Sequence, residues 1–106
     1  MKELVLEYPN GRMVLYVERF FPCTLQAGRK IFPLIRQYAK EEDIRALENY
    51  LSVLRGNDQK VAKALYAEAE KCDISRSRKR YLIAEARKLE QEWKRAERNL
   101  VLLGGG

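Results

Sequence analysis

The C-terminal quarter of the chain constrains the fold most, because its apolar residues repeat at helical spacing over an unusually long stretch. They recur at intervals of 4, 3, 4, 3 and 4, which is the spacing of a coiled-coil seam: Leu82, Ala86, Leu89, Trp93, Ala96 and Leu100. We therefore predict one amphipathic helix from about residue 75 to residue 101, which would be about 40 Å long. A compact domain of this size is only about 33 Å across. We expect the last turns to overhang, leaving the "LVLL" at 100–103 exposed for homodimer formation through this helix.

Residues 2–19 predict a β-hairpin. Leu4, Leu6 and Tyr8 alternate with other residues, and Asn10-Gly11 is a strong signal for a two-residue turn. That turn would pair Leu6 with Leu15. A type I turn opened by Pro9, with a bulge at Gly11, would shift the register by one residue. The sequence leaves both registers open.

Three further helices are expected between the hairpin and the C-terminal helix. The first spans about 25–40 after an N-cap at Thr24, and Pro33 should either make it irregular or split it in two. The second begins with acidic residues at 41–43 and should stop at Gly56. The third begins near Asp58 and reaches about residue 72. The whole chain, 1–106, is thus predicted to be one small α+β domain: a hairpin (2–19) on three or four helices (25–103), with a flexible tail at 104–106.

The residue inventory argues against catalysis. The chain has no histidine, which excludes Ser-His and Cys-His nucleophiles and histidine-ligated metals. It has no glycine-rich phosphate-binding motif either. Cys23 and Cys72 are the only cysteines, and we expect both to fill core positions, with a disulfide between them as the alternative. We predict a protein that is not an enzyme and that uses no cofactor and no metal.

The positive charge is concentrated in the last predicted helix. The chain carries a net charge of +6, and residues 75–106 alone hold nine Lys or Arg and four Glu, a net charge of +5. At 100° per residue, Arg76, Arg80, Arg87, Lys94 and Arg98 fall on one side, away from the apolar seam. Arg78 and Lys79 add to the first turn, where the helix dipole disfavours cations. The predicted binding residues are Arg76, Arg78, Lys79, Arg80, Arg87, Lys94 and Arg98.

Two interpretations of this basic face remain open. It can be a solvated surface laced with ion pairs such as Glu90–Lys94, or a surface for an anionic partner. The partner would be nucleic acid or a nucleoprotein, contacted through the phosphate backbone. The alternative is an acidic protein partner, in the manner of a phage or mobile-element accessory factor that inhibits a host nuclease or defence system, as anti-CRISPR proteins do. No apolar run reaches membrane-spanning length and no export signal is seen, so we expect a cytoplasmic protein that does not bind membranes.

Overall fold

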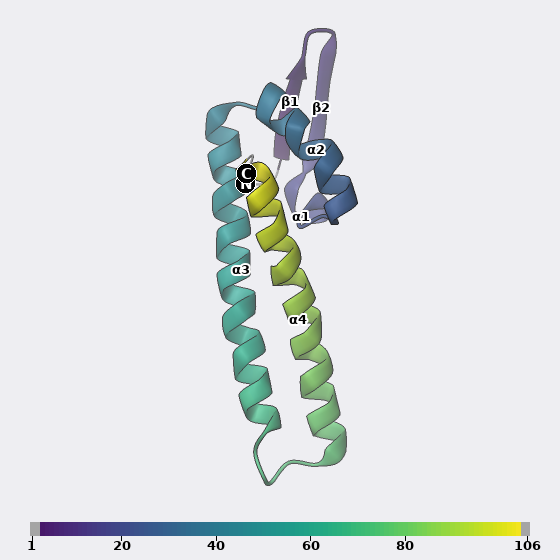
Figure 1. Ribbon diagram of the computed structural model, residues 1–106, viewed down its shortest axis with the longest axis vertical. Helices are drawn as coiled ribbons and strands as arrows, with labels where there is room; N and C mark the ends of the chain where they lie inside the picture. Colours follow the sequence, from purple (N-terminus) through teal and green to yellow (C-terminus); the bar gives the residue numbers. More distant parts are fainter. Residues whose placement is uncertain (1–2, 105–106) are drawn as a thin grey trace.

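The computed structural model describes residues 3–104, which form an N-terminal hairpin followed by helices (Figure 1). The strands are β1 (Glu3–Tyr8) and β2 (Gly11–Tyr16). The helices are α1 (Val17–Phe20), α2 (Leu25–Tyr38), α3 (Glu41–Ala69) and α4 (Arg76–Leu103). The predicted α+β fold class, with a hairpin first and a long helix last, is confirmed. Lys2 of the predicted hairpin and residues 105–106 of the predicted tail lie outside the described residues.

The hairpin has neither of the two expected registers. Leu4 pairs with Leu15 and Tyr8 with Gly11, so Pro9 and Asn10 form the turn. Proline is suited to the first central position of a turn, since its φ is fixed near −65° and it has no N–H to donate to a partner strand. Gly11 then opens β2 with φ of 156°, a value that other residues rarely adopt.

The observed register keeps the predicted apolar face. It differs by two residues from the register of an Asn10-Gly11 turn, and a shift of two leaves every side chain on its original side of the sheet. Leu4 and Leu6 are fully buried, whereas Met13, Val14 and Tyr16 of β2 are largely exposed. The hairpin therefore packs on the helices through β1, and β2 is its outer strand.

The second strand ends earlier than predicted. Residues 17–20 form the single turn α1, where the hairpin was expected to continue to residue 19. The apolar spacing changes here from two to three and four, at Val17, Phe20 and Phe21, which is the spacing of a helix. Val17 and Phe21 both enter the core.

Helix α2 is continuous, although Pro33 lies inside it. Its N-terminus is capped as predicted, since Thr24 Oγ1 accepts a hydrogen bond from the N–H of Ala27 at 3.2 Å. Pro33 is on the exposed side of the helix, where water can satisfy the carbonyl group that the proline leaves without a partner. Ile31 and Ile35 face the core.

Helix α3 runs without interruption through Gly56, so the predicted stop at Gly56 and the separate helix from Asp58 are wrong. Glycine inside a helix costs about 1 kcal/mol relative to alanine. Packing of α3 before and after Gly56 offsets this cost, because Leu51 and Ala62 are both buried. The three acidic residues of the first turn are as predicted.

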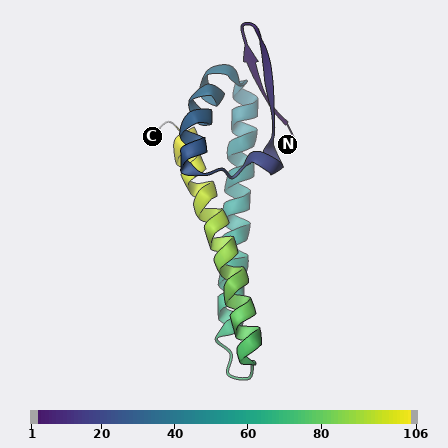
Figure 2. The same ribbon diagram turned by 90° about the vertical axis from the view of Figure 1, so that its right-hand side faces the viewer.

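The protein is elongated, with extents of 61 × 23 × 18 Å and a radius of gyration of 17.1 Å. Helices α3 and α4 are antiparallel and form a two-helix arm, which extends below a body made of the hairpin, α1, α2 and the near ends of both helices (Figures 1 and 2). The prediction that the last turns of α4 overhang the body is wrong, because the opposite end of the helix projects. The N-terminal half of α4 projects, whereas its C-terminal end packs in the body with Leu103 buried.

This arrangement corrects the predicted homodimer surface. Leu100 and Leu102 pack against the core, and Leu103 is 4% exposed. Only Val101 of the "LVLL" segment remains largely exposed. The apolar seam of α4 is covered by α3 and α2 over the described residues, since these are the elements that α4 contacts most.

Candidate nucleic-acid interface

The arm holds four of the seven predicted binding residues at its tip. Ser75 caps α4 there, its Oγ accepting a hydrogen bond from the N–H of Arg78 at 3.1 Å. The first turn of α4 contains no acidic residue. Small side chains at the α3–α4 contact, namely Ala62, Ala69 and Ala86, are buried and allow the two helices to approach closely. A narrow two-helix projection thus presents Arg76, Arg78, Lys79 and Arg80 to solvent.

All seven predicted binding residues are exposed. Within residues 3–104, ion pairs of 4.0 Å or less join other residues, and on α4 the one such pair is Lys88–Glu85 at 3.2 Å. The ion pair Glu90–Lys94 that the sequence allowed is not formed in this part of the chain. The charges of the seven residues are therefore not neutralised by neighbouring carboxylates in direct contact.

The seven residues form two groups rather than one. Five of them, Arg76, Arg80, Arg87, Lys94 and Arg98, recur along one side of α4, and we call this set the basic stripe. From Arg76 to Arg98 the stripe is about 33 Å long. By helical position Arg78 lies off the stripe, and its guanidinium group sits over the ring of Tyr81, 5.5 Å from the centroid. Tyr81 is 55% exposed and is an aromatic residue at the tip that the sequence reasoning missed.

The stripe ends beside α2. Lys94 and Arg98 border a groove of about 420 Å³ whose other lining residues are Leu25 of α2 and Glu97, Val101 and Leu102 of α4. Lys94 also lies 5.8 Å from the ring centroid of Trp93. The approach of residue 25 to residue 98 is not predictable from the sequence, because it depends on how α2 crosses α4.

Helix α2 extends the positive surface in a way that the sequence analysis missed. Over Leu25–Tyr38 it carries Arg29, Lys30 and Arg36 and no acidic residue, and all three are exposed. Arg36 donates a hydrogen bond from Nη1 to the carbonyl oxygen of Leu102. That contact satisfies a carbonyl group in the last turn of α4, where a cation also interacts well with the helix dipole. A charge count by helix would have shown the excess on α2.

Glu90 and Glu92 of α4 are directed toward α3, and each raises the pKa of a side chain on that helix. Burial raises the pKa of Tyr66, and Glu90 adds to this effect while Arg87 opposes it. Burial also raises the pKa of Asp58 to about 6, and the nearby Glu92 contributes to that shift. Glu90 and Glu92 thus interact with side chains of α3, and Arg87 of the basic stripe also lies near Tyr66.

The prediction that both cysteines fill core positions is only partly correct. Cys23 is buried as expected, but Cys72 is exposed in the turn between α3 and α4, and both are free thiols. Burial raises the pKa of the Cys23 thiol. In the described part of the chain, no three Cys, Asp or Glu side chains come together in a group that could hold a metal ion.

The comparisons with known proteins identify no relative. No family model, no curated protein and no solved structure matches the chain. Within residues 3–104, none of the helices combines the length and the apolar character that crossing a membrane requires.

Proposed function

We propose that this protein binds nucleic acid, alone or within a nucleoprotein complex, through the basic face of α4, and that it acts by binding without catalysis. The observation that supports the proposal best is that all seven basic residues are exposed and that, among residues 3–104, none of them has a carboxylate partner within 4.0 Å. An arrangement of like charges along one helix lowers the stability of the isolated helix. That local cost is offset when the charges meet a polyanion.

The chemistry of these side chains favours the phosphate backbone over the bases. Each phosphate that a Lys or Arg neutralises releases condensed counterions, which provides affinity without regard to sequence. The stripe contains only Lys and Arg, and its length of about 33 Å is close to one turn of B-form DNA. Tyr81 beside Arg78 is a single exposed ring, which is too little for a stacking platform on several bases.

The shape of the molecule supports the same function. The arm is two helices wide and carries the basic tip far from the hairpin (Figure 2). The tip can therefore approach a duplex or a nucleoprotein surface without the body being in the way. Lys94, Arg98 and the cations of α2 would extend the contact toward the body.

The decisive experiment is a titration of the full chain with three fluorescent probes of matched length: duplex DNA, single-stranded DNA and duplex RNA. If six or seven phosphate contacts form, the affinity should fall by about 10³-fold or more between about 50 and 200 mM salt. Absence of binding to all three probes at the lower salt concentration would refute the proposal. Binding that is displaced more efficiently by polyglutamate than by unlabelled nucleic acid would instead favour an acidic protein as the partner.

A further inference from the structure

The groove between α2 and the C-terminal end of α4 combines apolar surface with positive charge. The two helices pack against each other in the body (Figure 2). Leu25 of α2 and Val101 and Leu102 of α4 supply the apolar part of the lining, and the α4 side also carries Lys94 and Arg98. Val101 is 56% exposed, so apolar surface is open to solvent at this place.

Helix α2 adds two further cations on the side that borders the groove. Arg29 follows Leu25 by one helical turn and Arg36 follows Arg29 by two, so the three residues fall within about 40° of one another around the helix. The hydrogen bond from Arg36 to the carbonyl oxygen of Leu102 shows that this side of α2 is turned toward α4. Both arginines are exposed. The groove thus has cations on both helices, and Glu97 is the one acid among its lining residues.

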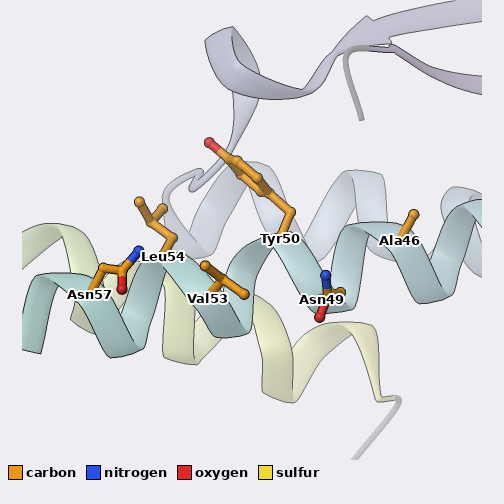
Figure 3. Close-up of a pocket in the computed structure, with 6 residues that line it drawn as sticks. All are labelled: Ala46, Asn49, Tyr50, Val53, Leu54 and Asn57. Atoms are coloured by element: carbon orange, nitrogen blue, oxygen red, sulfur yellow. The ribbon is translucent and has the colours of Figure 1, made fainter.

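A second groove of similar volume, on α3, lacks this combination. Figure 3 shows that its lining side chains all leave α3, and none of them is charged: Ala46, Asn49, Tyr50, Val53, Leu54 and Asn57. Tyr50 and Leu54 also pack against the core of the protein itself. Charge therefore distinguishes the groove between α2 and α4 as the one that selects a particular kind of partner.

We propose that this groove binds an acidic amphipathic helix of another protein. Its apolar side chains would lie on Leu25 and Val101, and its carboxylates would lie beside the cations of α2 and α4. A helix of this kind presents an apolar residue at every third or fourth position, which is the usual way in which a helix occupies a groove. A nucleic acid fits less well, because phosphates would leave the apolar lining uncovered and no lining residue is aromatic for stacking on a base.

The proposed site is separate from the basic tip of the arm. Val101 lies about 35 Å from Arg78 along α4, so the groove and the tip can be occupied at the same time. Lys94 and Arg98 belong to both the basic stripe and the groove, but the apolar contacts belong to the groove alone. The proposal therefore does not rest on nucleic-acid binding.

Fluorescence anisotropy with a labelled peptide measures binding to the full chain. The peptide has about 14 residues, with Leu at helical spacings of three and four and Glu elsewhere. Two matched peptides carry Ala in place of every Leu, or Gln in place of every Glu. The Leu-Glu peptide should bind at least about 10-fold more tightly than its Ala counterpart, because burial of one leucine side chain corresponds to about that factor. It should also bind more tightly than the Gln counterpart, and added salt should reduce this difference.

Two pairs of variants test where the peptide binds. Val101→Asp should weaken binding of the Leu-Glu peptide by about 10-fold or more, because it puts a charge on the apolar lining. Val61→Asp adds the same charge on α3, at a valine that is 49% exposed, and should have little effect. Arg29→Gln should weaken binding by about 2–5-fold, as expected for an exposed ion pair. Lys30→Gln removes the same charge from another side of α2 and should have little effect. Circular dichroism spectra establish that the variants are folded.

Three results would overturn the proposal. The first is equal affinity for the Leu-Glu peptide and its Ala counterpart, and the second is an equal effect of Val101→Asp and Val61→Asp. The third is a nucleic-acid affinity that falls further in Val101→Asp than in Val61→Asp, which would assign the groove to nucleic acid. Failure of the peptide to bind, with salt-dependent binding of nucleic acid intact, would refute this proposal and leave the proposed function standing.

Discussion

Asn99 of α4 forms two hydrogen bonds with the main chain of Cys23. Its Oδ1 accepts a hydrogen bond from the N–H of Cys23 at 3.0 Å, and its Nδ2 donates one to the carbonyl oxygen of Cys23 at 3.0 Å. Asn99 is fully buried. This pair fastens the segment between α1 and α2 to the C-terminal half of α4, across 76 positions of sequence.

Replacing Asn99 should therefore destabilise the protein strongly. Asn99→Leu keeps the volume roughly constant but leaves both main-chain groups of Cys23 buried without partners, which should lower the free energy of unfolding by about 2–4 kcal/mol. Urea denaturation at neutral pH measures the change. Gln91→Leu, on an exposed position of the same helix, serves as the control and should change stability by less than about 0.5 kcal/mol. An effect of that small size for Asn99→Leu would show that the two hydrogen bonds contribute little.

Asp58 should make stability depend on pH in an unusual direction. It is 7% exposed, its Oδ2 has no hydrogen-bond partner among the described residues, and burial, with a further contribution from Glu92, raises its pKa to about 6. In the unfolded chain its pKa is near 3.9, so the native state binds more protons between about pH 4 and pH 6. The contribution of Asp58 to stability is thus complete below pH 4 and is lost as the pH rises to 6.

The variant Asp58→Asn should remove this loss. Its stability relative to the natural chain should increase from about pH 4 to pH 6 and reach about 2–3 kcal/mol at pH 7. Thermal unfolding at several pH values measures the difference. Asp73→Asn, at an exposed position in the α3–α4 turn, is the matched control and should show no such trend. A difference that does not change with pH would contradict the assignment to Asp58 and its neighbour Glu92.

Gly56→Ala should stabilise the protein by about 0.5–1 kcal/mol. Gly56 lies inside α3, and a Cβ atom placed there meets nothing within 4 Å, so the gain in helix propensity has no steric cost. Gly28 provides the contrast, because a Cβ atom there would lie 2.8 Å from Leu102 Cδ1. Gly28→Leu should destabilise by about 1–3 kcal/mol through overpacking. Paired melting curves of the two variants test both statements, and a loss of stability in Gly56→Ala would mean that α3 bends at this residue.

Neutralising part of the basic stripe should reduce the salt dependence of nucleic-acid binding. The triple variant Arg80→Gln, Arg87→Gln, Lys94→Gln removes three phosphate contacts, so the slope of log affinity against log salt should become shallower by about 2.7. The control triple variant, Arg12→Gln, Lys40→Gln and Arg45→Gln, has the same net charge but changes exposed residues outside α2 and α4. If both variants lower the slope equally, binding depends on net charge and not on the stripe.

Local patterns in the sequence predict much of this fold. The period of two in β1, the cap at Thr24 and the seam of α4 all concern residues close together in the chain, and each is found. The errors arise where a local preference competes with packing. Gly56 resembles a helix stop, but the α3–α4 contact on both sides of it keeps the helix continuous. Pro9 decides the turn against the stronger Asn-Gly signal, because it cannot donate a hydrogen bond within a strand.

The candidate interface was predictable to a lesser extent. The exposure of the five residues of the basic stripe follows from the position of the apolar seam, since the opposite side of an amphipathic helix faces water. The sequence does not predict which end of α4 projects, because this depends on where α2 packs. The contact of Leu102 with Gly28 and the hydrogen bond from Arg36 to Leu102 join segments more than 60 positions apart. No sequence pattern within either segment predicts these contacts.

The continuity of α3 also has a mechanical meaning. Because the same helix belongs to the body and to the arm, no loop interrupts α3 between the body and the tip of a molecule that is 61 Å long. A partner held at the tip would be kept at a set distance and orientation from anything held at the hairpin. Helix α3 thus links two ends of different character, a body that contains the hairpin and a basic tip.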